Sequence, residues 1–159
     1  MKVLVCTDGS KQSRFAVEQA ALIAEGPNFD EVAVIHVDEG EPRYTALPWG
    51  EGYVPSEQEM ENYRKMLEER KEERKNFLLE ARQVFEEKGI RARTILKDGH
   101  PAQTIVGVAE EEGFGMIVIG SRGYGGLKRL FLGSVSNAVV QEAKNCCVVV
   151  VKHQSSQGL

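Results

Sequence analysis

The segment from Gly120 to Ser134, GSRGYGGLKRLFLGS, combines the residue types that bind phosphate groups. Its five glycines permit backbone conformations in which successive N–H groups point inward and surround an anion. The basic residues Arg122, Lys128 and Arg129 lie in the same segment. This composition favours a phosphate chain over other classes of ligand, although the glycines alone are also typical of simple turns.

The residues that follow this loop support the same interpretation. Residues 135–144 have the spacing of a helix, and the start of a helix offers an anion main-chain N–H groups and the positive end of a dipole. Ser134 and Ser136 would add hydroxyl donors. The sequence has neither the GK[ST] of a P-loop nor the dinucleotide fingerprint G-x-G-x-x-G at this position, so neither motif explains the loop.

The elements that would position the loop alternate along the chain. Short runs rich in β-branched residues predict strands at 2–7, 31–38, 91–97, 116–120 and 147–152. Helical spacing predicts helices at 10–25, 56–88, 101–112 and 135–144. This alternation predicts an α/β fold, a single three-layer α/β/α domain with a parallel sheet, whose ligands bind beyond the carboxyl ends of the strands. Ser10 is expected to cap the first helix, whose apolar stripe is predicted to comprise Phe15, Ala16, Leu22 and Ile23.

One segment interrupts the alternation. Residues 39–55 form a long loop rich in Gly and Pro, and residues 56–88 then predict one long helix with a capping box at Ser56 and Glu59. The stretch 68–76 holds no apolar residue, so we expect the first part of this helix to be solvated and to stand off the core. Docking of a partner on this helix is the alternative interpretation.

The composition limits the class of protein. A chain of 159 residues predicts one domain over 1–153 with a short tail at 154–159, and the net charge of −4 argues against nucleic acid or an anionic membrane as a partner. No apolar run approaches the ~18 residues of a membrane span, and no signal peptide is visible. The three cysteines suit a reducing compartment, so we expect a cytoplasmic protein with Cys6, Cys146 and Cys147 as small buried side chains.

The spacing of Gly120, Gly123 and the pair Gly133-Ser134 reads G-x2-G-x9-G-S, which resembles the ATP-binding signature of the universal stress protein family. Four further segments resemble the same family: VCTDGS at 5–10, VIHVD at 34–38, DGHP at 98–101 and CCVVVVK at 146–152. The resemblance covers nearly the whole chain apart from the loop at 39–55. It implies an adenine nucleotide alpha hydrolase-like fold with a five-stranded sheet in the order 3-2-1-4-5.

The resemblance also implies roles for individual residues. Thr7 and Asp8 would contact the nucleotide, Asp8 through the ribose hydroxyls, and the backbone of Val37 would meet the edge of the adenine. The remaining residues would line the ribose and phosphates or hold the phosphates at the helix start: Gly120, Arg122, Gly123, Gly133, Ser134, Val135 and Ser136. A homodimer through the last strand, 148–152, is implied as well, although the family often has proline where this chain has Cys147.

Other roles for these residues stay open at this point. Asp8 could cap the following helix, and Arg122 could be solvated. His36 is expected in the core, His100 at the surface, and Cys6 either in the core or in the wall of the adenine pocket.

The predicted pocket favours binding of ATP without efficient turnover. Hydrolysis needs an oriented water and usually a metal ion held by carboxylates or hydroxyls. Asp8, the one acid in the predicted pocket, is assigned to the ribose, so Mg²⁺ or Mn²⁺ would be held through the phosphates. The sequence thus predicts a stress protein in which nucleotide occupancy is a signal. The alternatives are a slow ATPase using the same pocket, or a nucleotide-independent interaction module acting through the 56–88 helix.

Overall fold

The computed structural model describes residues 1–40, 52–122 and 132–153. The predictions on Gly123, Lys128 and Arg129, on most of the loop 39–55 and on the tail 154–159 therefore lie outside the described residues.

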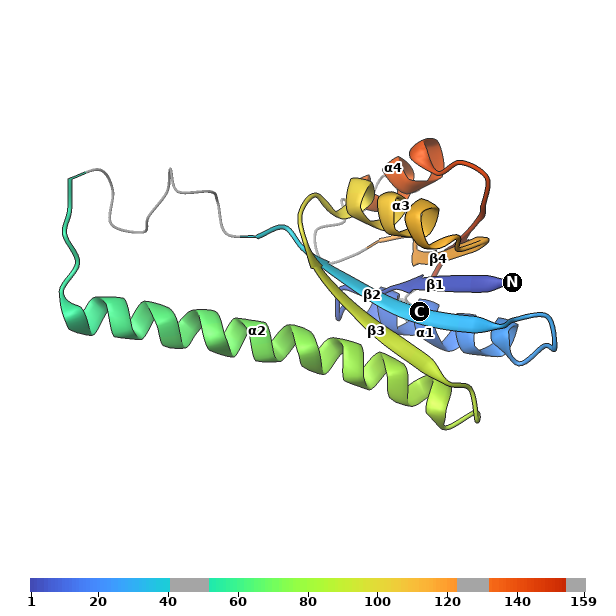
Figure 1. The fold of residues 1–159 in the computed structure, drawn as a ribbon, viewed down its shortest axis with the longest axis horizontal. Helices are drawn as coiled ribbons and strands as arrows, with labels where there is room; N and C mark the ends of the chain where they lie inside the picture. Colours follow the sequence, from blue (N-terminus) through green and yellow to red (C-terminus); the bar gives the residue numbers. More distant parts are fainter. Residues whose placement is uncertain (41–51, 123–131, 154–159) are drawn as a thin grey trace, which may run out of the picture.

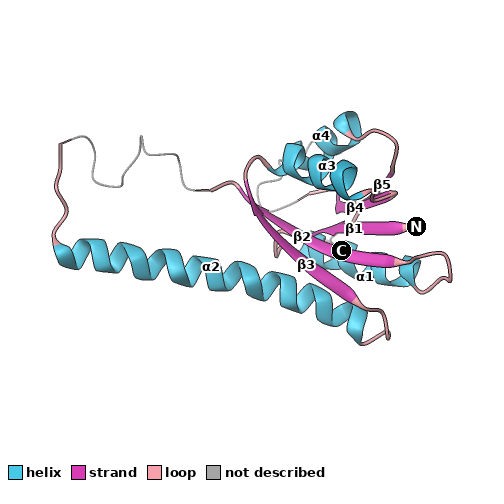
Figure 2. Ribbon diagram, in the orientation of Figure 1, coloured by secondary structure: helices cyan, strands magenta, loops and turns pink. Residues whose placement is uncertain are grey.

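The described residues form a parallel sheet with helices on both faces. The strands are β1 (Lys2–Cys6), β2 (Glu31–Asp38), β3 (Ala92–Asp98), β4 (Met116–Gly120) and β5 (Cys147–Val151). The helices are α1 (Lys11–Ala24), α2 (Glu57–Glu86), α3 (Pro101–Glu112) and α4 (Ser134–Glu142). The five strands lie in the order β3-β2-β1-β4-β5, all paired in parallel, as expected. Helices α1 and α2 cover one face and α3 and α4 the other (Figures 1 and 2).

Strands β1 and β2 have different lengths, which shapes the carboxyl edge of the sheet. Their ladder begins at the Lys2–Glu31 pair and ends at the Cys6–Ile35 pair. Strand β2 continues, paired with β3, as far as the Asp38–Asp98 pair. The chain leaves β1 while β2 still extends, so the edge is recessed beside the end of β2.

Helix α1 packs through small side chains. Ser10 is its N-cap, as predicted, and its Oγ accepts a hydrogen bond from the N–H of Ser13. The predicted apolar stripe was only partly right, because Ala16 is buried but Leu22 is 52% exposed. The buried positions follow the 3.6-residue period instead and are Ser13, Ala16, Val17, Ala20, Ala21 and Ala24. The alanines on this face let the helix lie close to the sheet.

Helix α2 is held to the sheet along its second half. The predicted capping box of Ser56 and Glu59 is present at its start. Its buried residues, Leu78, Ala81 and Phe85, all lie near its end, and its first half extends beyond the sheet, as expected (Figure 1). The polar stretch 68–76 is not wholly solvated, because Arg74 is half-buried and forms an ion pair with the buried carboxylate of Asp38.

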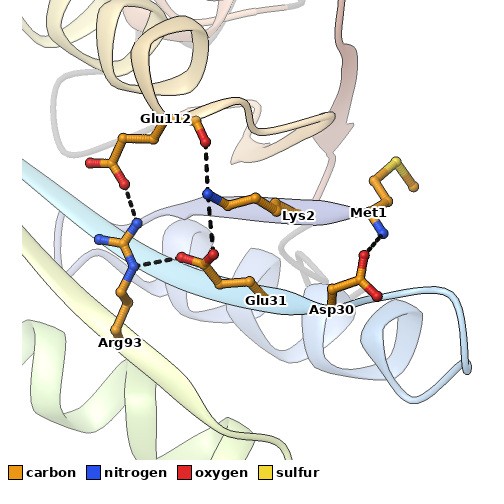
Figure 3. A network of polar contacts seen from close by, with 6 residues as sticks. All are labelled: Met1, Lys2, Asp30, Glu31, Arg93 and Glu112. Atoms are coloured by element: carbon orange, nitrogen blue, oxygen red, sulfur yellow. Dashed lines mark hydrogen bonds and ion pairs between the residues drawn. The ribbon is translucent and has the colours of Figure 1, made fainter.

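Charged residues join the amino ends of the first three strands (Figure 3). Lys2 Nζ lies 3.1 Å from Glu31 Oε2, and Arg93 Nε lies 2.7 Å from Glu31 Oε1. Arg93 also pairs with Glu112 at the end of α3. Arginine and lysine thus link β1, β2, β3 and α3 at the end of the sheet opposite Gly120.

Strand β5 forms one edge of the sheet, and its residues are half-buried or exposed. Cys147 at its start is exposed, which corrects the expectation that all three cysteines are buried. Its position at the edge explains this, because no strand covers it among the described residues. No helix in the described part of the chain is long and apolar enough to cross a membrane.

Candidate nucleotide site

A cavity of about 430 Å³ opens at the carboxyl edge of the sheet, between the ends of β1, β2 and β4 and the starts of α3 and α4. All predicted site residues that the structure describes line it: Thr7, Asp8, Val37, Gly120, Arg122, Gly133, Ser134, Val135 and Ser136. The structure therefore brings these residues together, although they come from four separate parts of the chain.

The turn after β1 carries Asp8 and is fixed by its own side chains. Asp8 Oδ1 accepts a hydrogen bond from the N–H of Ser10 at 2.9 Å. Ser10, and not Asp8, caps α1, so the capping role considered for Asp8 does not apply. Ser13 Oγ lies 3.3 Å from both the N–H of Asp8 and Thr7 Oγ1. A carboxylate has about four lone-pair sites, so Asp8 can keep its turn bond and still accept bonds from a ligand.

The end of β2 presents backbone to the same cavity. The N–H of Thr7 donates to the carbonyl of Ile35 at 3.0 Å, so Ile35 directs its peptide groups toward β1. Val37, two residues further, directs its peptide groups to the same side. The ladder between the strands has ended there, and Val37 lines the cavity. An N–H and a C=O side by side can pair with the edge of a heterocyclic base.

The start of α4 offers main-chain donors. Its first internal main-chain bond runs from the N–H of Asn137 to the carbonyl of Gly133 at 3.0 Å. The N–H groups of residues 134–136 precede this bond and lie at the open, positive end of the helix. This is the arrangement that binds phosphate.

The two serines of this helix start differ. The Ser136 hydroxyl is buried, and its one hydrogen is shared between the carbonyl oxygens of Ser121 (3.0 Å) and Gly133 (3.1 Å). The hydroxyl therefore connects Ser121 to the start of α4 and is not the donor to a ligand that the sequence predicted. Only the main-chain N–H of Ser136 is left to bind a ligand. Ser134 is exposed and lines the cavity.

Gly120 lies where the chain leaves β4 close to the start of α1. A Cβ at this position would lie 3.2 Å from the carbonyl oxygen of Gln12, so a larger side chain would push against that helix. The glycine thus permits a close approach of two backbones at the floor of the cavity.

The wall of the cavity is largely apolar. Cys6, Ile35, Pro101, Ile105 and Ile119 contribute to it, a set that suits the flat face of a base. Of these, the sequence interpretation had considered only Cys6, because the others look like ordinary core residues. Burial raises the pKa of the Cys6 thiol, so this residue is a neutral wall and not a nucleophile.

Acidic groups at the cavity are few. Glu39 lines it together with Asp8, an acid that the sequence interpretation missed because it begins the long loop. In the described part of the chain no cluster of three or more His, Cys, Asp or Glu side chains could hold a metal ion. His100 is exposed and His36 is buried, as predicted.

Comparison with known proteins identifies the family of this chain. The model of the universal stress protein family matches residues 1–152. The chain belongs to the universal stress protein family. Universal stress protein YxiE of Bacillus subtilis is 38% identical over 153 residues, which cover 95% of this chain and 98% of YxiE.

Solved structures of other universal stress proteins share the fold. Protein MJ0577 of Methanocaldococcus jannaschii superposes with a TM-score of 0.72 at 29% identity, covering 98% of this chain and 97% of that one. A universal stress protein in complex with cAMP gives a TM-score of 0.62 at 22% identity, covering 95% and 96% of the two chains. One from Archaeoglobus fulgidus in complex with dAMP gives 0.64 at 22% identity, covering 94% and 96%.

Proposed function

We propose that this universal stress protein binds ATP in the cavity at the carboxyl edge of its sheet and acts through nucleotide occupancy. The observation that carries the proposal is the convergence of three kinds of group on one cavity of about 430 Å³. These are a carboxylate at Asp8, an open backbone edge at Val37 and the N-terminal end of α4. Each suits a different part of one ligand, namely ribose, base and phosphate.

The distribution of polar groups favours an adenine nucleotide over a free phosphate. The α4 end alone would hold any anion, whereas the apolar wall and the Val37 backbone suit a base. Relatives in this family have been solved with cAMP and dAMP, which share the adenine base. The spacing G-x2-G-x9-G-S resembles the ATP-binding signature of the family, and this resemblance favours ATP among the adenine nucleotides.

We further propose that turnover is slow or absent. Asp8 is occupied by its turn and by the ribose, so a Mg²⁺ or Mn²⁺ ion would be bound mainly through the phosphates. Glu39, the other acid that lines the cavity, has no described hydrogen bond that would orient it as a general base for water. Binding that persists is suited to signalling, and the three free thiols suit a reducing cytoplasm.

A homodimer through β5 is part of the proposal. Cys147 donates its N–H to the carbonyl of Gly115, and the carbonyl of Val151 accepts from Ser121, so these residues face the rest of the sheet. Because peptide groups alternate along a strand, Val148 and Val150 direct theirs outward. A valine-rich edge with outward N–H and C=O groups is suited to pairing with a second copy.

Binding is tested by titrating ATP, GTP and inorganic phosphate into the purified chain in a calorimeter. We expect saturable binding of ATP at one site per chain, with GTP at least ~10-fold weaker, the change that one or two lost hydrogen bonds would cause. Equal affinity for ATP and GTP, or no binding, would contradict an adenine site. Incubation of the complex with Mg²⁺ then shows whether ADP accumulates, which would favour the slow ATPase.

A further inference from the structure

The buried side chain of His36 forms a hydrogen bond with the main chain of the neighbouring strand. It lies next to Val37 in β2, and its ring Nδ1 is 2.7 Å from the carbonyl oxygen of Thr7 at the end of β1. A carbonyl can only accept, so Nδ1 carries the proton and donates this bond. Both groups are buried, which makes the bond stronger than the same bond in water.

This bond takes the place of a regular sheet bond. In a parallel ladder, the bond from Thr7 N–H to the Ile35 carbonyl would be followed by one from Val37 N–H to the Thr7 carbonyl. Among the described residues the ladder stops after the first of these, and the Thr7 carbonyl accepts from the His36 ring. Side chains stand roughly perpendicular to a sheet, so the bond from the ring approaches this carbonyl from outside the plane in which the Val37 N–H would meet it.

Helix α2 holds the ring and the turn from the same side. The Phe77 ring meets the His36 ring edge-on, with centroids 5.8 Å apart at an interplanar angle of 80°. Phe77 also covers Gly9, whose φ is +80° and where a Cβ would lie 2.7 Å from the ring. A hollow of about 260 Å³ between α1 and α2 also borders Thr7, Gly9 and Phe77. The His36 bond and the Phe77 contact thus hold the turn from the α2 side, in addition to the hydrogen bonds within the turn itself.

We propose that His36 is a positioning residue for the base of the bound nucleotide. By withdrawing the Thr7 carbonyl from the ladder, it keeps the backbone edge of Val37 open toward the cavity, and Phe77 holds the ring in place. This inference rests on the proposed function, because it explains how the adenine edge becomes accessible in this chain.

Two substitutions at one position separate this role from packing. His36→Leu removes the donor and allows the Thr7 carbonyl to pair with Val37. His36→Asn keeps an N–H donor close to the position of Nδ1. We expect His36→Leu to lose ~10-fold in ATP affinity while its GTP affinity changes little, so that the preference for ATP shrinks ~10-fold. The Asn variant should stay within ~3-fold of the wild-type preference.

The ratio of ATP to GTP affinity is the decisive readout, because a merely structural defect would weaken both ligands alike. An unchanged ratio in a His36→Leu variant that still binds ATP would overturn this inference and leave the proposed function intact. Equal losses in the Leu and Asn variants would overturn it as well. Failure of the wild type to bind either nucleotide would instead overturn the proposed function.

A substitution in helix α2 tests the same inference if the His36→Leu variant does not fold. Phe77→Leu keeps an apolar side chain against Gly9 but removes the ring edge that faces His36. We expect it to reduce the ATP preference ~3-fold, whereas Leu79→Ala on the exposed side of the same helix should leave the preference unchanged. The same ratio in both variants would overturn the inference.

Discussion

Asp8 has one role in the fold and a second, proposed role toward the ligand. Its Oδ1 closes the turn by accepting from the N–H of Ser10, and the carboxylate also lines the cavity. The proposed bond to the ribose would use the lone pairs of the carboxylate that the turn leaves free. Ser136 differs, because its hydroxyl bonds to carbonyls within the protein and only its main-chain N–H is left for the proposed phosphate contact.

Asp8→Asn tests the ribose role without breaking the turn. The amide oxygen of Asn can still accept from Ser10, whereas the second carboxylate oxygen becomes an NH₂ group. We expect ATP affinity to fall ~10- to 100-fold, by the loss of a charge-assisted hydrogen bond to ribose, with an unchanged melting temperature. The affinity for 2′-deoxy-ATP should fall less. Parallel losses for the two nucleotides, measured by calorimetry, would rule out ribose recognition by Asp8.

At the scale of elements, the long helix α2 packs on the sheet along its second half. Its buried apolar residues lie in its second half, and Arg74 pairs with Asp38 at the end of β2, with Arg70 Nη2 4.0 Å from the same carboxylate. Burial lowers the pKa of Arg74, and the nearby charge of Asp98 opposes this effect. Arg74 therefore marks the point where the helix leaves the sheet.

Arg74→Ala should destabilise the fold. Removing the guanidinium leaves the buried Asp38 carboxylate without its nearest partner, and we expect a loss of about 1–3 kcal/mol, less than for a fully buried pair. The matched control is Lys71→Ala on the exposed side of the same helix, expected within about 0.5 kcal/mol of wild type. Urea unfolding measures both, and equal effects would show that the ion pair does not anchor α2.

The elements themselves follow largely from local sequence. The bounds of β2, β4 and α3 agree with prediction because β-branched runs and an initial proline mark them clearly. The predicted apolar stripe of α1 agrees only in part, because its buried face consists mainly of alanines, which carry little hydrophobic signal. The buried charge of Arg74 was equally hidden, since its partner lies far away in the sequence.

The site was predictable to the extent that a motif marked it. The glycine spacing and the VCTDGS turn pointed to residues that line one cavity, but the contact of His36 with Thr7 needs the register of two strands. Pro101 and Ile105 of α3 join the wall only through the crossover that packs α3 on the sheet. Contacts of this kind join residues that are far apart in the sequence, so the residue spacing within one segment cannot predict them.

At the scale of the whole molecule, the candidate nucleotide site and the charged cluster at the strand starts lie at opposite ends of the sheet. The cavity lies at the carboxyl ends of the strands, and the charged residues of Figure 3 lie at the amino ends. The hydrogen bond from Arg93, together with Lys2, lowers the pKa of Glu31. A pH change that acts on this cluster should therefore alter stability without acting directly on the cavity.

Glu31→Gln tests this separation. A carboxyl whose pKa is lower in the folded state stabilises the fold above the unfolded pKa of ~4.3, and this contribution is lost as pH falls through the folded value. We expect Glu31→Gln to cost about 0.5–1 kcal/mol at pH 7, because the cluster is partly exposed, and progressively less below about pH 4. Urea unfolding at several pH values measures the difference, and a constant cost across that range would contradict the assignment.

Val150→Pro tests the proposed homodimer. Proline removes an outward N–H of β5 but none of the bonds from β4, and edge strands tolerate it. We expect sedimentation to show a folded monomer that retains its ATP affinity, while the wild type dissociates only on dilution. A variant that remains dimeric, or a wild type that is monomeric at all concentrations, would place the interface elsewhere or remove it.

The nucleotide content of the purified chain tests the central claim most directly. The protein is denatured without added ligand, and the supernatant is separated by ion exchange alongside that of Asp8→Asn. We predict ATP near one equivalent per wild-type chain and much less in the variant, since a slow or absent turnover preserves the bound nucleotide. A wild-type chain that is empty and also fails to bind added ATP would contradict the account and make the loop after β4 a structural connection only.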